Sequence, residues 1–213
     1  AATQTEYKYR GDRYLLGDAF DSRTACDQNH VEKNLRQLRE ARRQADWLIV
    51  SLHSQDLIGR SWLTAKKRTE VTEQPDFVRD FAHRCIDAGA DVFACHGPHL
   101  LMGIEIYRGK PIFYSLGNLI MQNETLNHVP AYPFDRFGLG ARATPSDFFD
   151  HRTGNGTKGH PASPEYWQSV AALCRFDKRE LKQIELYPVD MGFGQPRAQR
   201  GRPLLATGDL AQA

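Results

Sequence analysis

The sequence has no apolar run approaching the roughly 20 residues that a membrane-spanning helix needs. Its N-terminus shows no basic segment followed by an apolar stretch. An excess of one charge is also missing, because 28 Lys and Arg face 26 Asp and Glu and the formal net charge is only +2. The chain therefore has no transmembrane segment by this criterion and no broad electrostatic field for nucleic acid or a membrane surface.

Closely spaced cysteines are absent as well. No Cys-x-x-Cys pair occurs that would suggest a zinc knuckle or a redox motif, and we interpret all four cysteines as structural thiols: Cys26, Cys85, Cys95 and Cys174. This pattern leaves the cellular compartment open.

What is present is an ordinary globular composition, with 213 residues, 40% hydrophobic and 25% charged. We expect one domain over 1–213. The chain begins at Ala1 without methionine, and 208–213 resembles the first turn of a helix. We therefore expect a partial domain, the C-terminal part of a longer protein.

The clearest pattern is a strand, a helix and a second strand. Residues 46–53 and 90–95 are short apolar runs typical of buried strands. Between them lies a predicted helix that follows Pro75 and ends at Gly89. A connection of this kind leaves the two strands parallel.

An amphipathic helix precedes the first strand. Asn29, with Glu32 three residues later, resembles a capping box. The apolar residues that follow have helical spacing: Val31, Leu35, Leu38, Ala41 and Ala45.

The rest of the chain predicts antiparallel pairs. A glycine turn separates 103–107 from 111–115, which predicts a hairpin, and 166–176 with 181–189 predicts a final pair. Between them, 121–165 is rich in Pro, Gly, Asn and Asp, and we expect a long, irregular excursion there.

Three histidines stand where the predicted parallel strands end. His53 closes the first strand, His96 follows the second, and His99 comes three residues later across Gly97-Pro98. Ligands of open α/β sheets gather at the carboxyl ends of strands, and imidazole suits zinc, manganese or iron. The alternative reading, hydrogen-bonded histidines at a strand rim, stays open from spacing alone.

Two segments carry a family resemblance: ARRQADWLIVSLHS, and DAGADVFACHGPHLLMGIEIYRGKPIFYSLGN from Asp87 to Asn118. They resemble the late motifs of the CapA family of poly-gamma-glutamate capsule synthesis, within the calcineurin-like metallophosphatase superfamily. The likeness extends loosely from Asn34 to Arg202. It implies an α/β fold that is the C-terminal half of a layered αββα sandwich.

The resemblance also implies a metal site. His53 matches the isolated histidine of the fourth metal-binding block, and His96 and His99 match the two histidines of the Gly-His-x-His block. Two divalent cations, manganese, iron or zinc, are then expected in the full-length protein. The early metal-binding blocks of the superfamily are not recognisable. Leu16-Gly17-Asp18 and Gln28-Asn29-His30 resemble them superficially, but these two segments lie too close together and too near the fourth block.

Further candidates lie around this site. Tyr114 and Asn118 are candidates to orient substrate, and the alternative is that they only form a strand end and turn. Glu105 is a candidate to support a ligand histidine, and the alternative is an exposed strand residue. Three arginines are candidates to bind a phosphate or a polyanion, with a solvated basic loop as the alternative: Arg197, Arg200 and Arg202.

Two functions follow from the resemblance. The first is a metal-dependent hydrolase whose cations activate water against a phosphoester or an amide-linked glutamate polymer. The second is a non-catalytic assembly or export factor that binds an anionic capsule polymer on the same scaffold.

Overall fold

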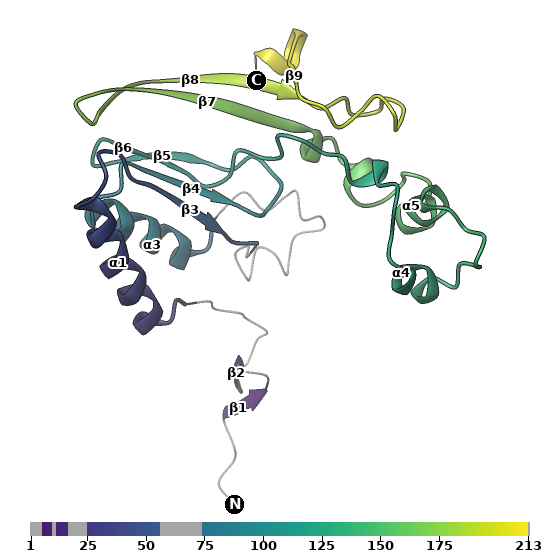
Figure 1. Ribbon diagram of the computed structural model, residues 1–213, viewed down its shortest axis with the longest axis horizontal. Coiled ribbons are helices and arrows are strands. Elements are labelled where there is room, and N and C mark those ends of the chain that lie inside the picture. The colour runs from purple at the N-terminus through teal and green to yellow at the C-terminus, as the bar shows by residue number, and fades with distance from the viewer. Residues whose placement is uncertain (1–5, 10–11, 17–24, 56–73, 213) are drawn as a thin grey trace, which may run out of the picture.

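The computed structural model describes residues 6–9, 12–16, 25–55 and 74–212. Helices, a central sheet and a second sheet lie in successive layers (Figure 1). Gly17 and Asp18, part of the superficial likeness to an early metal-binding block, lie outside the described residues.

The central sheet has the strand order β3-β4-β6-β5. Strand β3 (Ile49–His53) is parallel to β4 (Val92–His96), which is parallel to β6 (Lys110–Phe113). Strand β5 (Ile104–Tyr107) pairs with β6 in the predicted antiparallel hairpin. The predicted parallel pair and the hairpin are both confirmed.

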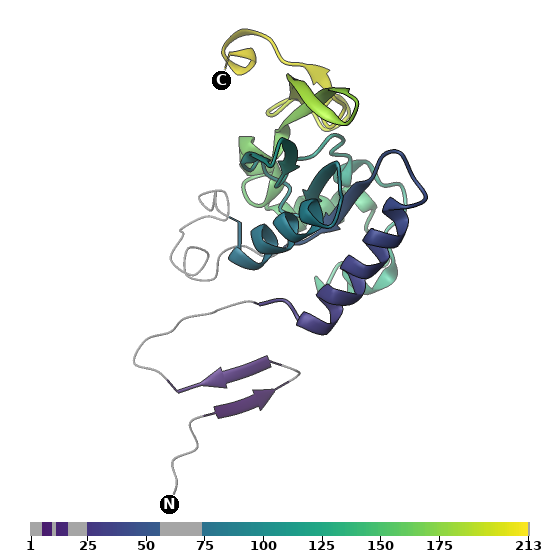
Figure 2. The same ribbon diagram turned by 90° about the vertical axis from the view of Figure 1, so that its left-hand side faces the viewer.

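Two helices cover one face of this sheet (Figures 1 and 2). Helices α1 (Gln28–Arg42) and α3 (Asp76–Asp87) bury their apolar stripes there, and Phe81 of α3 packs edge-on against the fully buried Phe93. The predicted capping box at Asn29 is wrong. The N-cap of helix α1 is Asp27, two residues before Asn29, because the side chain of Asp27 accepts a free backbone N–H of the first turn, that of His30, at 3.0 Å.

The second sheet lies over the other face of the central sheet (Figures 1 and 2). Its strands are β7 (Gln168–Asp177), β8 (Glu180–Asp190) and the short β9 (Leu204–Leu205), all antiparallel. Val189 of β8 and the residues that flank these strands, Trp167 just before β7 and Met191 just after β8, join the same hydrophobic core. The order helices, sheet, sheet confirms the α/β class.

Strand β3 forms one edge of the central sheet, and within the described residues no strand pairs with its outer side. Apolar side chains are exposed beside it, Trp47 at 47% and Ile49 at 66%.

The segment 121–165 contains more structure than expected. It includes α4 (Ala131–Arg136), α5 (Pro145–Thr153) and the 3₁₀ turns η2 (Asn123–Thr125) and η3 (His160–Ala162). Helix α5 begins with a capping box between Thr144 and Asp147 and ends at the left-handed Gly154. These local signals outweigh a composition that suggests irregular chain.

The chain ends carry small elements. Strands β1 (Glu6–Tyr9) and β2 (Asp12–Leu15) form an antiparallel hairpin near the N-terminus. The turns η4 (Pro164–Trp167) and η5 (Gly208–Ala211) precede β7 and follow β9. No helix in the described ranges is long and apolar enough to cross a membrane, and all four cysteines are free thiols, as interpreted from the sequence.

A buried carboxylate joins the layers at the start of β4. Asp91 is fully buried and accepts hydrogen bonds from Arg42 at 2.7 Å, Lys110 at 2.9 Å and Arg179 at 3.0 Å. The backbone N–H of Leu48 donates to the same carboxylate at 3.0 Å. Burial alone would raise the pKa of Asp91, but these donors outweigh it and lower the pKa to about 2.

We expect Asp91→Asn to lower the free energy of unfolding by about 3 kcal/mol, because it leaves the partly buried Arg42 and Lys110, and the more exposed Arg179, without their counter-charge. Urea denaturation measures this. Asp87→Asn is the control: Asp87 pairs only at the surface, with Arg108 at 3.0 Å, so its loss should cost less than about 1 kcal/mol. Equal losses would contradict the central role of Asp91.

The stability of the wild-type protein and that of Asp91→Asn should depend differently on pH. Because folding lowers the pKa of Asp91 from 3.8 to about 2, ionised Asp91 stabilises the fold fully above about pH 4, and this contribution is lost as the pH falls through about 2. The stability difference between wild type and Asp91→Asn should therefore be constant at neutral pH and narrow below about pH 4. A difference that widens in acid would contradict the assignment.

Candidate functional site

His53 and His96 are brought together by strand register. They are direct partners of the parallel strands β3 and β4, so their side chains project from the same face of the sheet. Their Nδ1 atoms lie 3.1 Å apart, and their ring centroids are 4.9 Å apart. The two imidazoles therefore meet at the carboxyl ends of the strands, as the sequence predicted.

This spacing fits a shared cation. Two imidazole nitrogens that each lie about 2.0–2.1 Å from one tetrahedral ion are about 3.3 Å apart, close to the 3.1 Å found. Ser51 Oγ lies 3.1 Å from Nε2 of His96. When Nε2 of His96 donates its proton to Ser51, its Nδ1 is left as the metal-binding atom.

His99 is oriented separately, by Asn118. The amide nitrogen of Asn118 donates to two carbonyl oxygens, those of His99 at 3.2 Å and Tyr166 at 3.1 Å. The amide oxygen therefore faces Nδ1 of His99, at 2.7 Å. Nδ1 must carry the proton, because an amide oxygen only accepts, and Nε2 of His99 remains as a free acceptor.

The three predicted ligands do not form one complete centre. Among the residues that the structure describes, no group of three or more His, Cys, Asp or Glu side chains could hold a metal ion. His53 and His96 are a contacting pair, and His99 lies on the following loop, with a left-handed φ of 65°.

Glu105 and Tyr114 do not lie with these histidines. Glu105 accepts from Tyr114 at 2.6 Å and pairs with His83 of α3 at 2.8 Å, so it faces the helix layer and supports none of the predicted ligands. Burial would raise the pKa of Glu105, but the hydrogen bonds from Tyr114 and His83 lower it. Burial and the nearby Glu105 charge raise the pKa of Tyr114. Strand alternation decides this, because the odd-numbered residues of β5 face α3.

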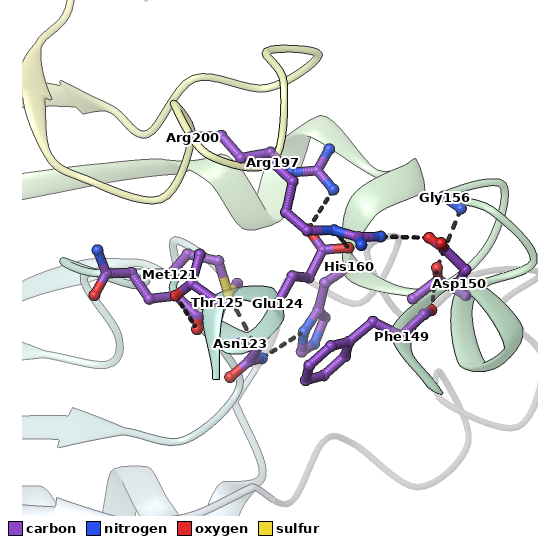
Figure 3. A network of polar contacts seen from close by, with 12 residues as sticks. Met121, Asn123, Glu124, Thr125, Phe149, Asp150, Gly156, His160, Arg197 and Arg200 are labelled. Atoms are coloured by element: carbon purple, nitrogen blue, oxygen red, sulfur yellow. Dashed lines mark hydrogen bonds and ion pairs between the residues drawn. The ribbon is translucent and has the colours of Figure 1, made fainter. Parts of the chain in front are cut away.

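Two of the three candidate arginines are paired with carboxylates of the chain, and the third is exposed. Arg200 pairs with Glu124 and places its guanidinium over the Trp167 ring, 5.0 Å from the centroid. Arg197 pairs with Asp150 at 2.5 Å and approaches Glu124 at 3.6 Å. Arg202 is exposed. Figure 3 shows Arg197 and Arg200 converging on Glu124, so these two arginines are partly neutralised by carboxylates of the chain itself.

Sequence reasoning missed two residues of the site. Ser51 lies two residues before His53, and period-two alternation is the signal that could have found it. His160 belongs to none of the motifs in the sequence, but its ring lies 5.7 Å from that of His99 and 4.4 Å from that of Tyr166. No local pattern predicts this contact across 61 residues of chain.

The loop between His96 and His99 is held tightly against β3. Gly97 has φ +134°, and a Cβ there would lie 2.4 Å from the carbonyl oxygen of Ser54. The backbone N–H of Ser54 in turn donates to the His96 carbonyl at 2.8 Å. Only glycine allows this approach, so Gly97 sets the position of the histidine loop.

Comparison with known proteins adds the family. The family model of the bacterial capsule synthesis protein PGA_cap matches residues 3–123, a range that contains His53, His96, His99 and Asn118. The chain belongs to this capsule synthesis protein family. The resemblance to CapA proteins is thereby confirmed.

Individual relatives agree. The chain is 33% identical over 204 residues to an uncharacterized protein of Sinorhizobium fredii, covering 92% of this chain and 42% of the relative. It is 38% identical over 84 residues to the PGA biosynthesis protein CapA of Bacillus subtilis, which covers 39% of this chain and 19% of the relative. It is 46% identical over 39 residues to a capsule biosynthesis protein CapA of Bacillus anthracis, 18% of this chain and 10% of the relative. The chain thus spans less than half the length of these relatives.

We expect Gly97→Ala to lower the free energy of unfolding by about 2 kcal/mol or more, because it combines a positive φ with a backbone clash. Gly103→Ala is the control, since a Cβ there meets nothing within 4 Å, and it should change stability by less than about 0.5 kcal/mol. Chemical denaturation compares the two. Equal stabilities would show that the loop does not need glycine at position 97.

Proposed function

We propose that this protein is a metal-dependent hydrolase of anionic capsule polymer synthesis, with His53 and His96 as two ligands of its metal centre. The observation that carries the proposal is the 3.1 Å separation of their Nδ1 atoms at the carboxyl ends of two parallel strands. The family assignment supports a role in capsule synthesis, because two relatives are named for PGA or capsule biosynthesis.

The chain's own residues prepare the imidazoles. Ser51 contacts the second nitrogen of His96, and Asn118 fixes which nitrogen of His99 is free. Such contacts to the remote ring nitrogen are how proteins orient metal-binding histidines. We assign His99 as a further ligand through Nε2. A divalent cation held by these groups would lower the pKa of a bound water and stabilise charge at an attacked phosphoryl or acyl centre.

A second candidate is a binding factor for the same polymer. It is favoured by the exposed Arg152 and Lys158, which line a pocket together with His160 and can hold an anion without any reaction. Hydrolysis separates the two candidates, because only the first requires it.

The metal assignment predicts that His53→Ala with His96→Ala removes bound metal. Manganese, iron and zinc would be measured by elemental analysis beside hydrolysis of a generic phosphoester. His128→Ala is the control, an exposed histidine in the 121–165 segment, and it should retain both metal and activity. Metal content unchanged in the double variant would overturn the ligand assignment. Metal without hydrolysis would favour the binding factor.

The orienting role of Ser51 predicts that Ser51→Ala weakens metal affinity about tenfold, the low end for removing such a contact. Ser51→Thr keeps the hydroxyl and suits a strand, so it should bind metal as wild type does. Titration with manganese would compare the three proteins. Equal affinity of the Ala variant would show that Ser51 does not position His96.

A further inference from the structure

A pocket of about 140 Å³ lies between α5, η2, η3 and the end of η4. His160 lines it, and the ring of His160 is 5.7 Å from that of His99. At about 30 Å³ per water molecule in the liquid, the pocket has room for one small organic group. It can hold a single unit of a polymer, not a long stretch of chain.

The pocket has an apolar floor. Phe149 and Trp167 are buried at 3% and 2% exposure, and Met121 lies beside them. Trp167 also donates from its indole nitrogen to the backbone carbonyl of His160 at 2.8 Å, which fixes η3 against the floor. A ligand group with an aliphatic stem would fit this surface.

The rim is basic. Arg152 and Lys158 line the pocket and are exposed, and neither has an ion-pair partner in the part of the chain that the structure describes. The other two arginines nearby, Arg197 and Arg200, are matched by Asp150 and Glu124. Arg152 and Lys158 are therefore the excess positive charge, which favours an anionic ligand.

The wall also offers an acceptor. Glu124 lines the pocket, and its Oε1 is buried without a hydrogen-bond partner among the described residues, with Arg197 Nε no nearer than 3.6 Å (Figure 3). A buried carboxylate oxygen without a hydrogen bond is costly, and an amide N–H of a ligand would supply one. The pocket thus combines two free cations, an apolar floor and a free acceptor.

We propose that this pocket binds one carboxylate-bearing, amide-linked residue of an anionic polymer, with its carboxylate on Arg152 and Lys158 and its amide N–H toward Glu124. The polymer would then continue past His160 toward His99. This inference deepens the proposed function and rests on it for the kind of polymer, but binding here requires no metal.

The test is binding of γ-linked tetraglutamate to the protein freed of metal by chelation and dialysis, measured by calorimetry. Removing both free cations in Arg152→Ala with Lys158→Ala should weaken binding at least about tenfold. The matched control is Lys33→Ala with Arg36→Ala, an equally exposed Lys and Arg on α1, which should change affinity less than about twofold. Both double variants should melt as wild type does, since they remove exposed side chains.

γ-Linked tetraglutamine, the neutral analogue, tests the need for charge and should bind at least about tenfold more weakly than tetraglutamate. The proposal is overturned by equal binding of the two peptides, by equal weakening in the two double variants, or by no binding of tetraglutamate to wild type. Metal content and phosphoester hydrolysis of Arg152→Ala with Lys158→Ala are measured separately. Normal values there would leave the proposed hydrolase standing even if this pocket were disproved.

Discussion

The buried carboxylate of Asp91 is the interaction on which the arrangement of the layers depends. It binds Arg42, Lys110 and Arg179, which lie 49, 19 and 88 residues away along the chain. A fully buried charge is tolerated only when it is paired and hydrogen-bonded, so helix α1, strand β6 and the β7–β8 turn must all reach it. The backbone of Leu48 also binds Asp91 twice. Its N–H donates to the Asp91 carboxylate at 3.0 Å, and its carbonyl accepts from the backbone N–H of Asp91 at 2.8 Å.

Those backbone contacts set the register that brings the histidines together. Just beyond Leu48 and Asp91, Ile49 is paired with Val92, and four residues later His53 is paired with His96. A slip of one residue would turn one imidazole to the opposite face of the sheet. The charge cluster at one end of the strands therefore determines the geometry of the candidate metal site at the other end.

The second sheet connects the same two ends. Its turn has left-handed φ values at Lys178 and Arg179, 45° and 71°, a conformation that costs energy in residues other than glycine and that Arg179 offsets by binding Asp91. At the far end of the sheet, Tyr166 accepts from Asn118, and Ser169 bridges to Gly117. These contacts fix the segment that contains His160 next to His99. Strand ends therefore position His53 and His96, and the connecting segments form the pocket.

Local patterns in the sequence determined α1 and α3, the strands of the central sheet, the pair of β7 with β8, and the meeting of His53 with His96, because period and strand direction are properties of neighbouring residues. The same patterns missed α5 and misplaced the start of α1, where a single capping side chain outweighs composition. Only the tertiary structure decided that Glu105 faces α3, that Asn118 orients His99, and that His160 lies against His99 while it lines a pocket together with Lys158. These contacts depend on the packing of segments far apart in the chain, which no spacing in the sequence encodes.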